Sequence, residues 1–146
     1  DYVASTVTTS SGLYAFTDLP QATDYRFVVI PGGNLQLYVE TGLLFNGDAE
    51  KNVALPCGST ISGTVTLAGG GRATLYLFTA ANAFVDYTAT DEGGTYAFNG
   101  LTAGDYKVLA VADGHAPKWY SGASSIAEAT VVAAGAENVN ISLSLE

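Results

Sequence analysis

The chain contains the stretch Gly93-Gly94-Thr95-Tyr96-Ala97-Phe98-Asn99-Gly100-Leu101, and it repeats this stretch closely as Ser11-Gly12-Leu13-Tyr14-Ala15-Phe16-Thr17-Asp18-Leu19. A second match follows each copy, since Asp24–Ile30 corresponds to Asp105–Val111. The period of about 80–90 residues exceeds the roughly 20–50 residues of solenoid repeats and equals the size of a small domain. We therefore expect two related domains.

The chain has runs with the two-residue periodicity of β-strands. Apolar residues or Gly alternate with hydroxylic residues over Ile61–Leu67, and Val139–Leu145 alternates in the same way. Turns that contain Gly separate the alternating runs, and Gly adopts positive φ at little steric cost. Short alternating strands joined by such turns are typical of antiparallel sheets that pack as a sandwich. The sequence thus predicts an all-β chain with tandem antiparallel β-sandwiches.

The two repeats differ in completeness. We expect a partial first repeat at 1–56 and a complete second repeat at 57–146, and the first has no counterpart of Ile61–Thr79. Single helical turns are expected only at Ser125–Ala129 and Asp48–Lys51. The expected strands lie near 60–67, 72–79, 84–90, 95–101, 105–112, 129–134 and 138–145 in the second repeat, and near 2–8, 13–19, 24–30, 35–40 and 51–55 in the first.

The charge balance restricts the classes of partner. Five Lys and Arg residues stand against fourteen Asp and Glu residues, which gives a net charge of −9. Clustered cations supply most of the affinity for nucleic-acid backbones and for anionic membranes, so we expect neither partner. The sequence has no run of 18 apolar residues, so we expect no membrane span.

The single cysteine and the end of the chain leave alternatives open. Cys57 is predicted either to fill a buried apolar site or to pair with a thiol of another chain. Leu145-Glu146 is either native or derived from an expression vector. Scarce Lys, absent Met and abundant small residues favour a secreted or cell-surface bacterial protein.

The second repeat resembles the carboxypeptidase regulatory-like domains of the transthyretin-like (prealbumin-like) sandwich superfamily, a Greek-key, Ig-like architecture. The resemblance lies in Ile61-Ser62-Gly63-Thr64-Val65, in Thr90–Phe98, in Leu101 with Gly104-Asp105-Tyr106, and in Gly114–Tyr120. It implies a secreted or surface β-module, often in tandem, that is attached to enzymes, adhesins or cell-envelope proteins. Cna-B modules are similar in outline, but the chain has no Lys–Asn–acid set for an isopeptide bond.

A calcium site is the only metal site that the sequence suggests. Asp86, Asp91 and Glu92 could supply oxygen ligands, of which calcium needs six to eight. The corresponding turn of the first repeat is Ser10-Ser11, which has no carboxylate. We therefore favour turn formation over metal binding for these acids, and we expect no cofactor.

Catalysis is not expected. His115 is the only histidine, so a Ser-His-Asp triad would have to use it, and the chain has no Gly-x-Ser-x-Gly motif. Intradiol dioxygenases and hydroxyisourate hydrolases share the sandwich topology but depend on more than one histidine.

Three functional hypotheses remain. The first is a structural spacer or protein-interaction module that contacts the rest of its parent protein or neighbouring chains. The second is carbohydrate or peptide binding through Trp119 and Tyr120, with His115 nearby, although this segment is more simply interpreted as a loop that caps the core. The third is a strand-exchanged homo-oligomer or fibre, in which Val139–Leu145 is a plausible donor to the incomplete first repeat.

Overall fold

The computed structural model describes residues 2–45 and 47–146, which form two compact units. The first unit comprises the chain up to Val29 together with Tyr38–Ala54, and the second comprises Ile30–Leu37 and Leu55–Glu146. Within the described residues the regular structure is ten strands and one short 3₁₀ turn at Tyr120–Gly122, with no α-helix. The predicted all-β fold class is confirmed.

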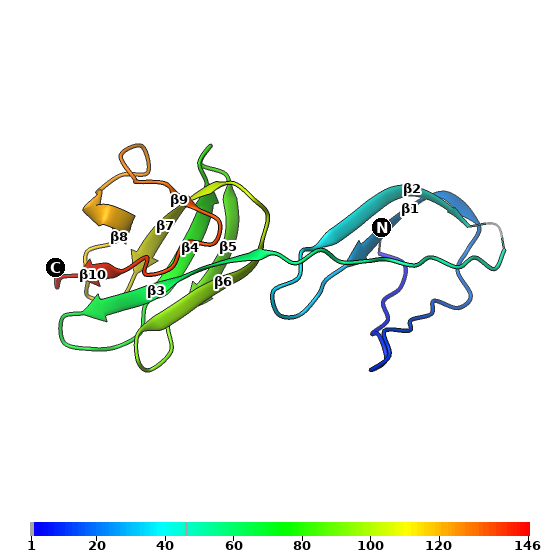
Figure 1. Ribbon diagram of the computed structural model, residues 1–146, viewed down its shortest axis with the longest axis horizontal. Coiled ribbons are helices and arrows are strands. Elements are labelled where there is room, and N and C mark those ends of the chain that lie inside the picture. Colours follow the sequence, from blue (N-terminus) through cyan, green and yellow to red (C-terminus); the bar gives the residue numbers. More distant parts are fainter. Residues whose placement is uncertain (1, 46) are drawn as a thin grey trace. The chain divides into compact units, whose positions relative to one another are not determined.

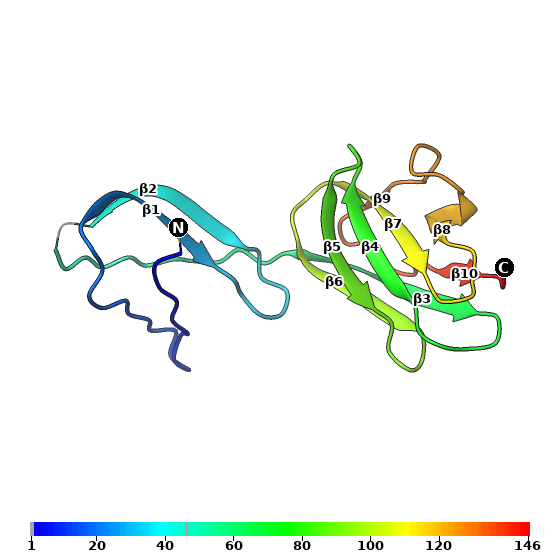
Figure 2. The ribbon, with the colours of Figure 1, turned by 180° about the vertical axis from the view of Figure 1, so that it is seen from behind.

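The second unit is a sandwich of two sheets (Figures 1 and 2). The strand order is β10-β3-β6 in one sheet and β5-β4-β7-β8 in the other, where β9 also pairs with β7. All pairs are antiparallel except β10 with β3, which is parallel. The strands are β3 (Ser59–Leu67), β4 (Thr74–Thr79), β5 (Phe84–Ala89), β6 (Thr95–Leu101), β7 (Asp105–Val111), β8 (Lys118–Trp119), β9 (Val132–Ala133) and β10 (Ile141–Leu143).

The alternating residues of these strands form one closed core. Ile61, Leu75, Val108 and Phe98 are at most 1% exposed, and they come from four different strands of the two sheets. Alternation places every second side chain on one face of a strand, so the apolar set of each strand meets that of the facing sheet. The buried Tyr96 hydroxyl donates to the Val139 carbonyl at 2.6 Å, which satisfies its polar group inside the core.

The parallel contact between β3 and the C-terminal segment depends on Gly63. A Cβ atom at this position would lie 2.2 Å from the carbonyl oxygen of Val139. Because β3 is paired on both sides, only glycine allows the two backbones to approach this closely.

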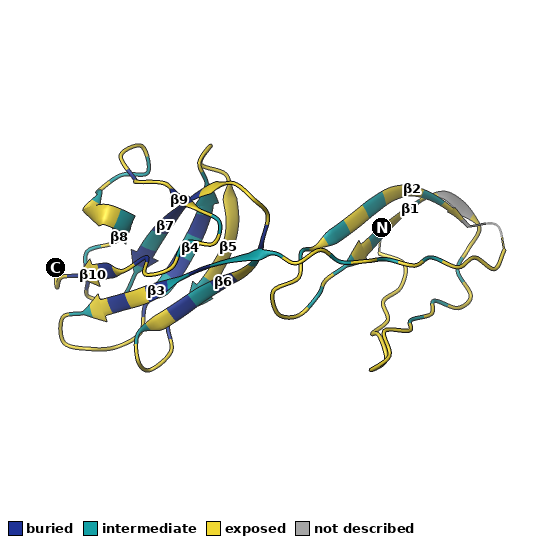
Figure 3. Ribbon diagram, viewed as in Figure 1, coloured by how far each residue is buried: buried dark blue, intermediate teal, exposed yellow. Residues whose placement is uncertain are grey.

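The first unit has far less structure. Its strands β1 (Ala22–Val29) and β2 (Tyr38–Phe45) form a two-stranded antiparallel sheet. Tyr14, Phe16 and Tyr38 surround Phe27, with ring centroids 5.6–6.4 Å apart. No described side chain of this unit is buried, whereas the buried residues lie in the second unit (Figure 3).

Several sequence-based expectations are wrong in this part of the chain. Residues 2–8, 13–19 and 51–55 are not strands, and the strand expected near 35–40 instead runs over Tyr38–Phe45. A strand is stable only when a neighbouring strand accepts its backbone hydrogen bonds, and alternation alone does not supply that neighbour. The strand expected near 24–30 is confirmed as β1.

Smaller differences concern the second unit. The strands expected near 129–134 and 138–145 shorten to Val132–Ala133 and Ile141–Leu143. At Ser125–Ala129 the structure has a single hydrogen-bonded turn, in which the Glu128 amide donates to the Ser125 carbonyl, but no α-helix. Asp48–Lys51 does not form a helical turn. Ile30–Leu37 also packs with this unit, since the amide of Gly58 donates to the Asn34 carbonyl and the amide of Gly100 donates to Asn34 Oδ1.

Candidate functional site

The most exposed aromatic surface of the second unit lies at β5. This strand is the last in its sheet, so only one of its two edges is paired, with β4. Phe84 is 57% exposed and Tyr87 is 66% exposed. Large aromatic side chains on a sheet edge bury much apolar area when a partner covers them.

A β-bulge brings these two aromatic residues to one face. Tyr76 pairs with Tyr87, but the register then shifts, so that Phe78 pairs with Phe84 and Val85 is left over. Without the extra residue, Phe84 and Tyr87 would point to opposite faces of the sheet, because side chains alternate along a strand.

Four rings therefore form a continuous surface, which we call the aromatic face: Tyr76, Phe78, Phe84 and Tyr87. The ring centroids of Tyr76 and Tyr87 lie 6.3 Å apart, and those of Phe78 and Phe84 lie 5.8 Å apart. Leu75 and Leu77 alternate with Tyr76 and Phe78 on β4 and are fully buried. The aromatic face is thus the outer side of the sheet, opposite the core.

The predicted binding residues Trp119 and Tyr120 adjoin the aromatic face but are themselves covered. The indole of Trp119 is 8% exposed and lies 5.3 Å from the Phe78 ring, centroid to centroid. Tyr120 is half-buried and packs against the core. These positions agree with a loop that caps the sandwich, and ligand binding through the two residues stays a prediction.

A lysine fixes this capping segment to β7. Lys107 is 7% exposed, although its chain position places it on the outer side of the sheet. Its ammonium donates to the Ile126 carbonyl at 2.8 Å and to Asn82 Oδ1 at 3.0 Å. These charge-assisted bonds compensate the burial of the cation and hold the segment after Tyr120 over β7.

His115 is buried and lies between two backbone carbonyls. Its Nδ1 is 2.8 Å from the Asp113 oxygen, and its Nε2 is 2.9 Å from the Ala68 oxygen. Carbonyl oxygens only accept hydrogen bonds, so both ring nitrogens donate when the imidazole is protonated. The bond to Asp113, followed by that to Ala68, raises the pKa of His115 above its ordinary value. The ring therefore joins two loops, and both its nitrogens are occupied.

The three acids suggested for calcium do not converge. Asp91 Oδ1 accepts hydrogen bonds from the amides of Gly93 and Thr95, as expected for a residue that forms a turn. Asp86 accepts from the neighbouring Tyr87 amide. The described residues hold no group of three or more His, Cys, Asp or Glu side chains that could bind a metal ion. A calcium site stays a prediction that this geometry does not support.

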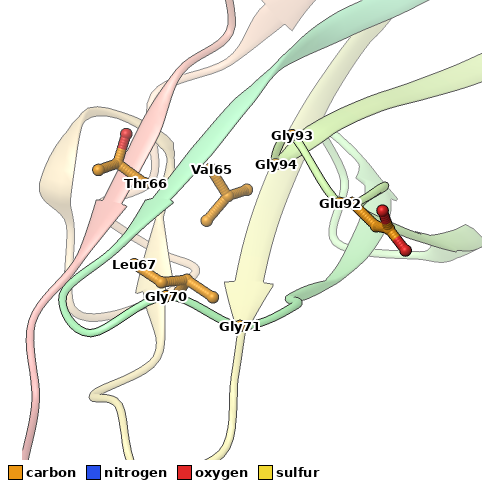
Figure 4. Close-up of a pocket in the computed structure, with 8 residues that line it drawn as sticks. All are labelled: Val65, Thr66, Leu67, Gly70, Gly71, Glu92, Gly93 and Gly94. Atoms are coloured by element: carbon orange, nitrogen blue, oxygen red, sulfur yellow. The ribbon is translucent and has the colours of Figure 1, made fainter.

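Glu92 borders a shallow hollow of about 250 Å³ near this turn. In Figure 4 the Glu92 carboxylate points away from Val65 and Leu67. It lies 3.6 Å from the Arg72 guanidinium, with 94% of its side chain exposed. The hollow is lined by Val65, Thr66, Leu67, Gly70, Gly71, Glu92, Gly93 and Gly94.

The position of Cys57 shows that one of the two predictions for this residue is wrong, and pairing with a thiol of another chain stays a prediction. The residue is exposed and unpaired, so the prediction of a buried apolar filler is wrong. It lies in the segment that connects to β3, where Leu35 forms an isolated bridge with it. A connecting segment on the surface leaves the side chain outside the core.

The aromatic face was not predicted from the sequence. The strand near 84–90 was expected, but strict alternation groups Phe84 with Asp86 rather than with Tyr87. The bulge that changes this grouping depends on pairing with β4, which sequence periodicity does not encode. The only signal was the unusual density of aromatic residues in β4 and β5.

Comparison with known families identifies the second unit. The model of the family described as carboxypeptidase regulatory-like domain matches residues 60–144, which is more than half of the 146-residue chain. A comparison with curated proteins gave no match. Among the described residues, no helix has both the length and the apolar character needed to cross a lipid bilayer. The match begins in β3 and ends one residue after β10, and it shows that the chain belongs to the carboxypeptidase regulatory-like domain family.

Proposed function

We propose that this chain is a non-catalytic β-sandwich module that binds another protein through the aromatic face. The observation that carries the proposal is the exposure of Phe84 and Tyr87 beside Tyr76 and Phe78. Aromatic residues are enriched at the centres of protein interfaces, where a few of them supply most of the binding energy. The family match supports a module without catalytic function.

The structure favours side-chain contacts over strand addition at this edge. The bulge at Val85 interrupts the regular spacing of backbone groups along β5, and Asp86 accepts the Tyr87 amide. Bulges and charged residues are features that protect edge strands against indiscriminate pairing. The partner is therefore expected to bury the rings rather than to extend the sheet.

A peptide library tests this proposal directly. Phage that display random peptides are selected on the intact chain, and the selected peptides are then measured against a double variant, Phe84→Ser with Tyr87→Ser. We expect at least a tenfold loss of affinity, because the two most exposed rings are removed. Val131→Ser is the matched control, since Val131 is 44% exposed in the same unit and lies outside the aromatic face. Peptides that bind the double variant as tightly as the wild type would contradict the proposal.

Carbohydrate binding is the second candidate. The rings of Tyr76 and Tyr87 are tilted by 33° to each other, and a sugar ring could stack on the exposed Tyr87 ring. A glycan array probed with the intact chain would favour this candidate if binding were lost in Tyr87→Ser. Binding that is lost in Tyr120→Ser but kept in Tyr87→Ser would instead favour the segment at Trp119 and Tyr120.

We further propose that the first unit is a partial copy of the same domain. Two pairs of matched tyrosine hydrogen bonds support this relation. Tyr14, the counterpart of Tyr96, donates to the Lys51 carbonyl at 2.6 Å. Tyr25, the counterpart of Tyr106, donates to the Pro20 carbonyl, and Tyr106 donates to Thr102, the counterpart of Pro20. In each unit one of these tyrosines thus reaches a later segment of the chain, and the other closes a local turn.

The setting that we propose for the module is a larger secreted or cell-surface bacterial protein, in which the module acts as a spacer as well as an interaction site. The low proportion of charged residues and the net charge of −9 support a soluble, repulsive surface. Detection of the protein in the culture medium or on intact cells, with an antibody against the second unit, tests this localisation. Recovery only from the cytoplasm would contradict it.

A further inference from the structure

The three segments of the first unit that fail to form strands have one property in common. By the sequence match, 2–8 corresponds to β5 and 13–19 to β6. The bonds of Tyr14 to Lys51 and of Tyr96 to Val139 align 51–55 with Val139–Leu143, which contains β10. In the second unit β5 pairs only with β4, and both β6 and β10 pair only with β3. All three segments therefore lack the one strand on which their counterparts depend.

One segment of the first unit does form a strand, and its counterpart in the second unit has partners besides β4. β1 corresponds to β7, which pairs with β8 and β9 as well as with β4. β2 occupies the position of β8, so β1 keeps one of its partners. Among the described residues, the first unit thus has no counterpart of the hairpin β3–β4, Ser59–Thr79.

The side chains that this hairpin would cover are partly exposed to solvent. Tyr14 and Phe16 are half-buried, whereas their counterparts Tyr96 and Phe98 are 2% and 1% exposed. Beside Tyr14 lies an open hollow of about 300 Å³ between residues 6–9 and 13–15. Removing apolar surface from water is favourable, so this open surface favours association with a segment that covers it.

The side chains that would contact the hairpin already interact with one another. Tyr14 ties 13–19 to the segment at Lys51, and the Phe27 ring stacks on Tyr14 with an interplanar angle of 23°. Little further ordering is needed at these side chains when a strand binds, and a preorganised site loses less conformational entropy on binding.

We propose that the first unit is an acceptor for a β-hairpin with the residue pattern of Ser59–Thr79. Its first strand places the counterparts of Ile61 and Val65 against Tyr14 and Phe16, and carries Gly at the counterpart of Gly63. Its second strand pairs with the open edge of β1. This inference rests on the proposed relation between the two units, and it is independent of the aromatic face.

A second copy of the chain cannot readily supply the hairpin from its own sandwich. Ile61, Leu75 and Leu77 are fully buried there, so removal of β3 and β4 would open the core of the donor. The same objection applies to the donor segment suggested by the sequence, since Val139, Ile141 and Leu143 are at most 4% exposed in their own unit. The partner is therefore a hairpin that is not already part of a closed sandwich.

Amide hydrogen exchange with a synthetic peptide of residues 59–79 tests the proposal on the intact chain. We expect exchange at 2–8, 13–19 and 51–55 to slow at least tenfold when the peptide is present in excess. The matched control peptide carries Ile61→Thr and Val65→Thr, which keeps the strand propensity but removes the apolar contacts. It is expected to leave exchange unchanged.

Two variants of the chain locate the contact. Phe16→Ala is expected to weaken peptide binding at least tenfold, because the counterpart of Phe16 is a core residue. Val28→Ala is the control on the opposite face, since Val28 is 39% exposed and alternates with Phe27 along β1. Equal weakening by the two substitutions would overturn the proposed orientation.

A fusion keeps the proposal testable if the free peptide aggregates. Residues 58–83 are joined directly before Tyr2, because Ala83 precedes Phe84, the counterpart of Tyr2, and the native connection is thus reproduced. Slower exchange at the same three segments supports the proposal. Unchanged exchange in both experiments overturns it, as does slower exchange confined to the second unit. If Tyr14→Phe and Tyr25→Phe also have no effect on exchange in the first unit, the proposed relation between the units fails as well.

Discussion

The two units begin from nearly the same residues and reach different degrees of closure. Tyr96 and Phe98 lie inside a two-sheet core, whereas Tyr14 and Phe16 lie in a half-open cluster on a two-stranded sheet. The local sequences are matched, so the difference arises from what pairs with them. The comparison indicates that a strand sequence of this type is necessary for the fold, but becomes a strand only when its neighbour is present.

The largest expected contrast is between the two phenylalanines of the repeated stretch. Phe98→Ala should destabilise the second unit by about 3–5 kcal/mol, because a large ring is removed from a closed core. Phe16→Ala should leave that unit unchanged. The fluorescence of Trp119, the only tryptophan, reports unfolding of the second unit during denaturant titration. Equal denaturation midpoints for Phe98→Ala and Phe16→Ala would contradict the difference in packing between Phe98 and Phe16.

The close approach of β3 to the C-terminal segment gives the next largest effect. Gly63→Ala should cost about 1–3 kcal/mol, since the new Cβ lies 2.2 Å from the Val139 oxygen and the backbone must shift. Gly32→Ala is the control, because a Cβ there has no neighbour within 4 Å. Denaturation of both variants, followed by Trp119 fluorescence, measures the difference. A neutral Gly63→Ala would mean that this contact is loose.

The paired tyrosines provide a finer comparison. Tyr96→Phe leaves the Val139 carbonyl without its partner in the core and should cost about 1–2 kcal/mol. Tyr14→Phe removes the matching bond to Lys51, where water can replace the lost hydroxyl, so its effect should be smaller. Amide exchange resolved for each unit measures both effects. A larger effect for Tyr14 would contradict the assignment of the closed core to the second unit.

The second unit should lose stability as the pH rises. The hydrogen bonds to Asp113 and Ala68 raise the pKa of His115 in the folded state. Their contribution is complete below the ordinary pKa of about 6.5 and is lost as the pH rises through the raised value. The thermal midpoint, followed by Trp119 fluorescence, should therefore fall across this range, and His115→Gln should remove the pH dependence. If the thermal midpoint of the wild type rose with pH while that of His115→Gln did not, the proposed effect of His115 on stability would be contradicted.

The first unit should respond to pH in the opposite direction. Glu40 accepts hydrogen bonds from Lys51 and from Tyr38, and these bonds lower the pKa of its carboxyl group, with Lys51 as the larger cause. The resulting stability is present above the ordinary pKa and is lost as the pH falls through the lowered value. Amide exchange near Lys51 should quicken in acid, and Glu40→Gln should abolish this change. Because the pair is partly exposed, the effect should be the smallest of the five.

Most strands of the second unit could be predicted from the sequence because their signals are local. Alternation over Ile61–Leu67 and the Gly-containing turn before Thr95 each act within a few residues. The sequence also led to the hypothesis that the first repeat lacks a hairpin, which stays a prediction. It wrongly predicted strands at 2–8, 13–19 and 51–55, since periodicity describes the two faces of a strand and not its hydrogen-bond partners.

The candidate site could not be predicted from such local signals. Phe84 and Tyr87 share a face only because of the bulge opposite β4, and Trp119 is covered where it packs beside Phe78. Sequence reasoning favoured a capping role for the loop at Trp119, and it did not use the density of aromatic residues in β4 and β5, which was the one signal for the aromatic face.

By itself, the sequence determined the all-β class, the repeated stretch, the resemblance to carboxypeptidase regulatory-like domains and the absence of a second histidine. These properties depend on residue type and short-range spacing. The tertiary structure decided which of the two copies closes into a core, which aromatic rings reach the surface and which are covered. Those outcomes depend on pairing between segments far apart in the chain, because backbone hydrogen bonds and apolar contacts are satisfied only when both partners are present.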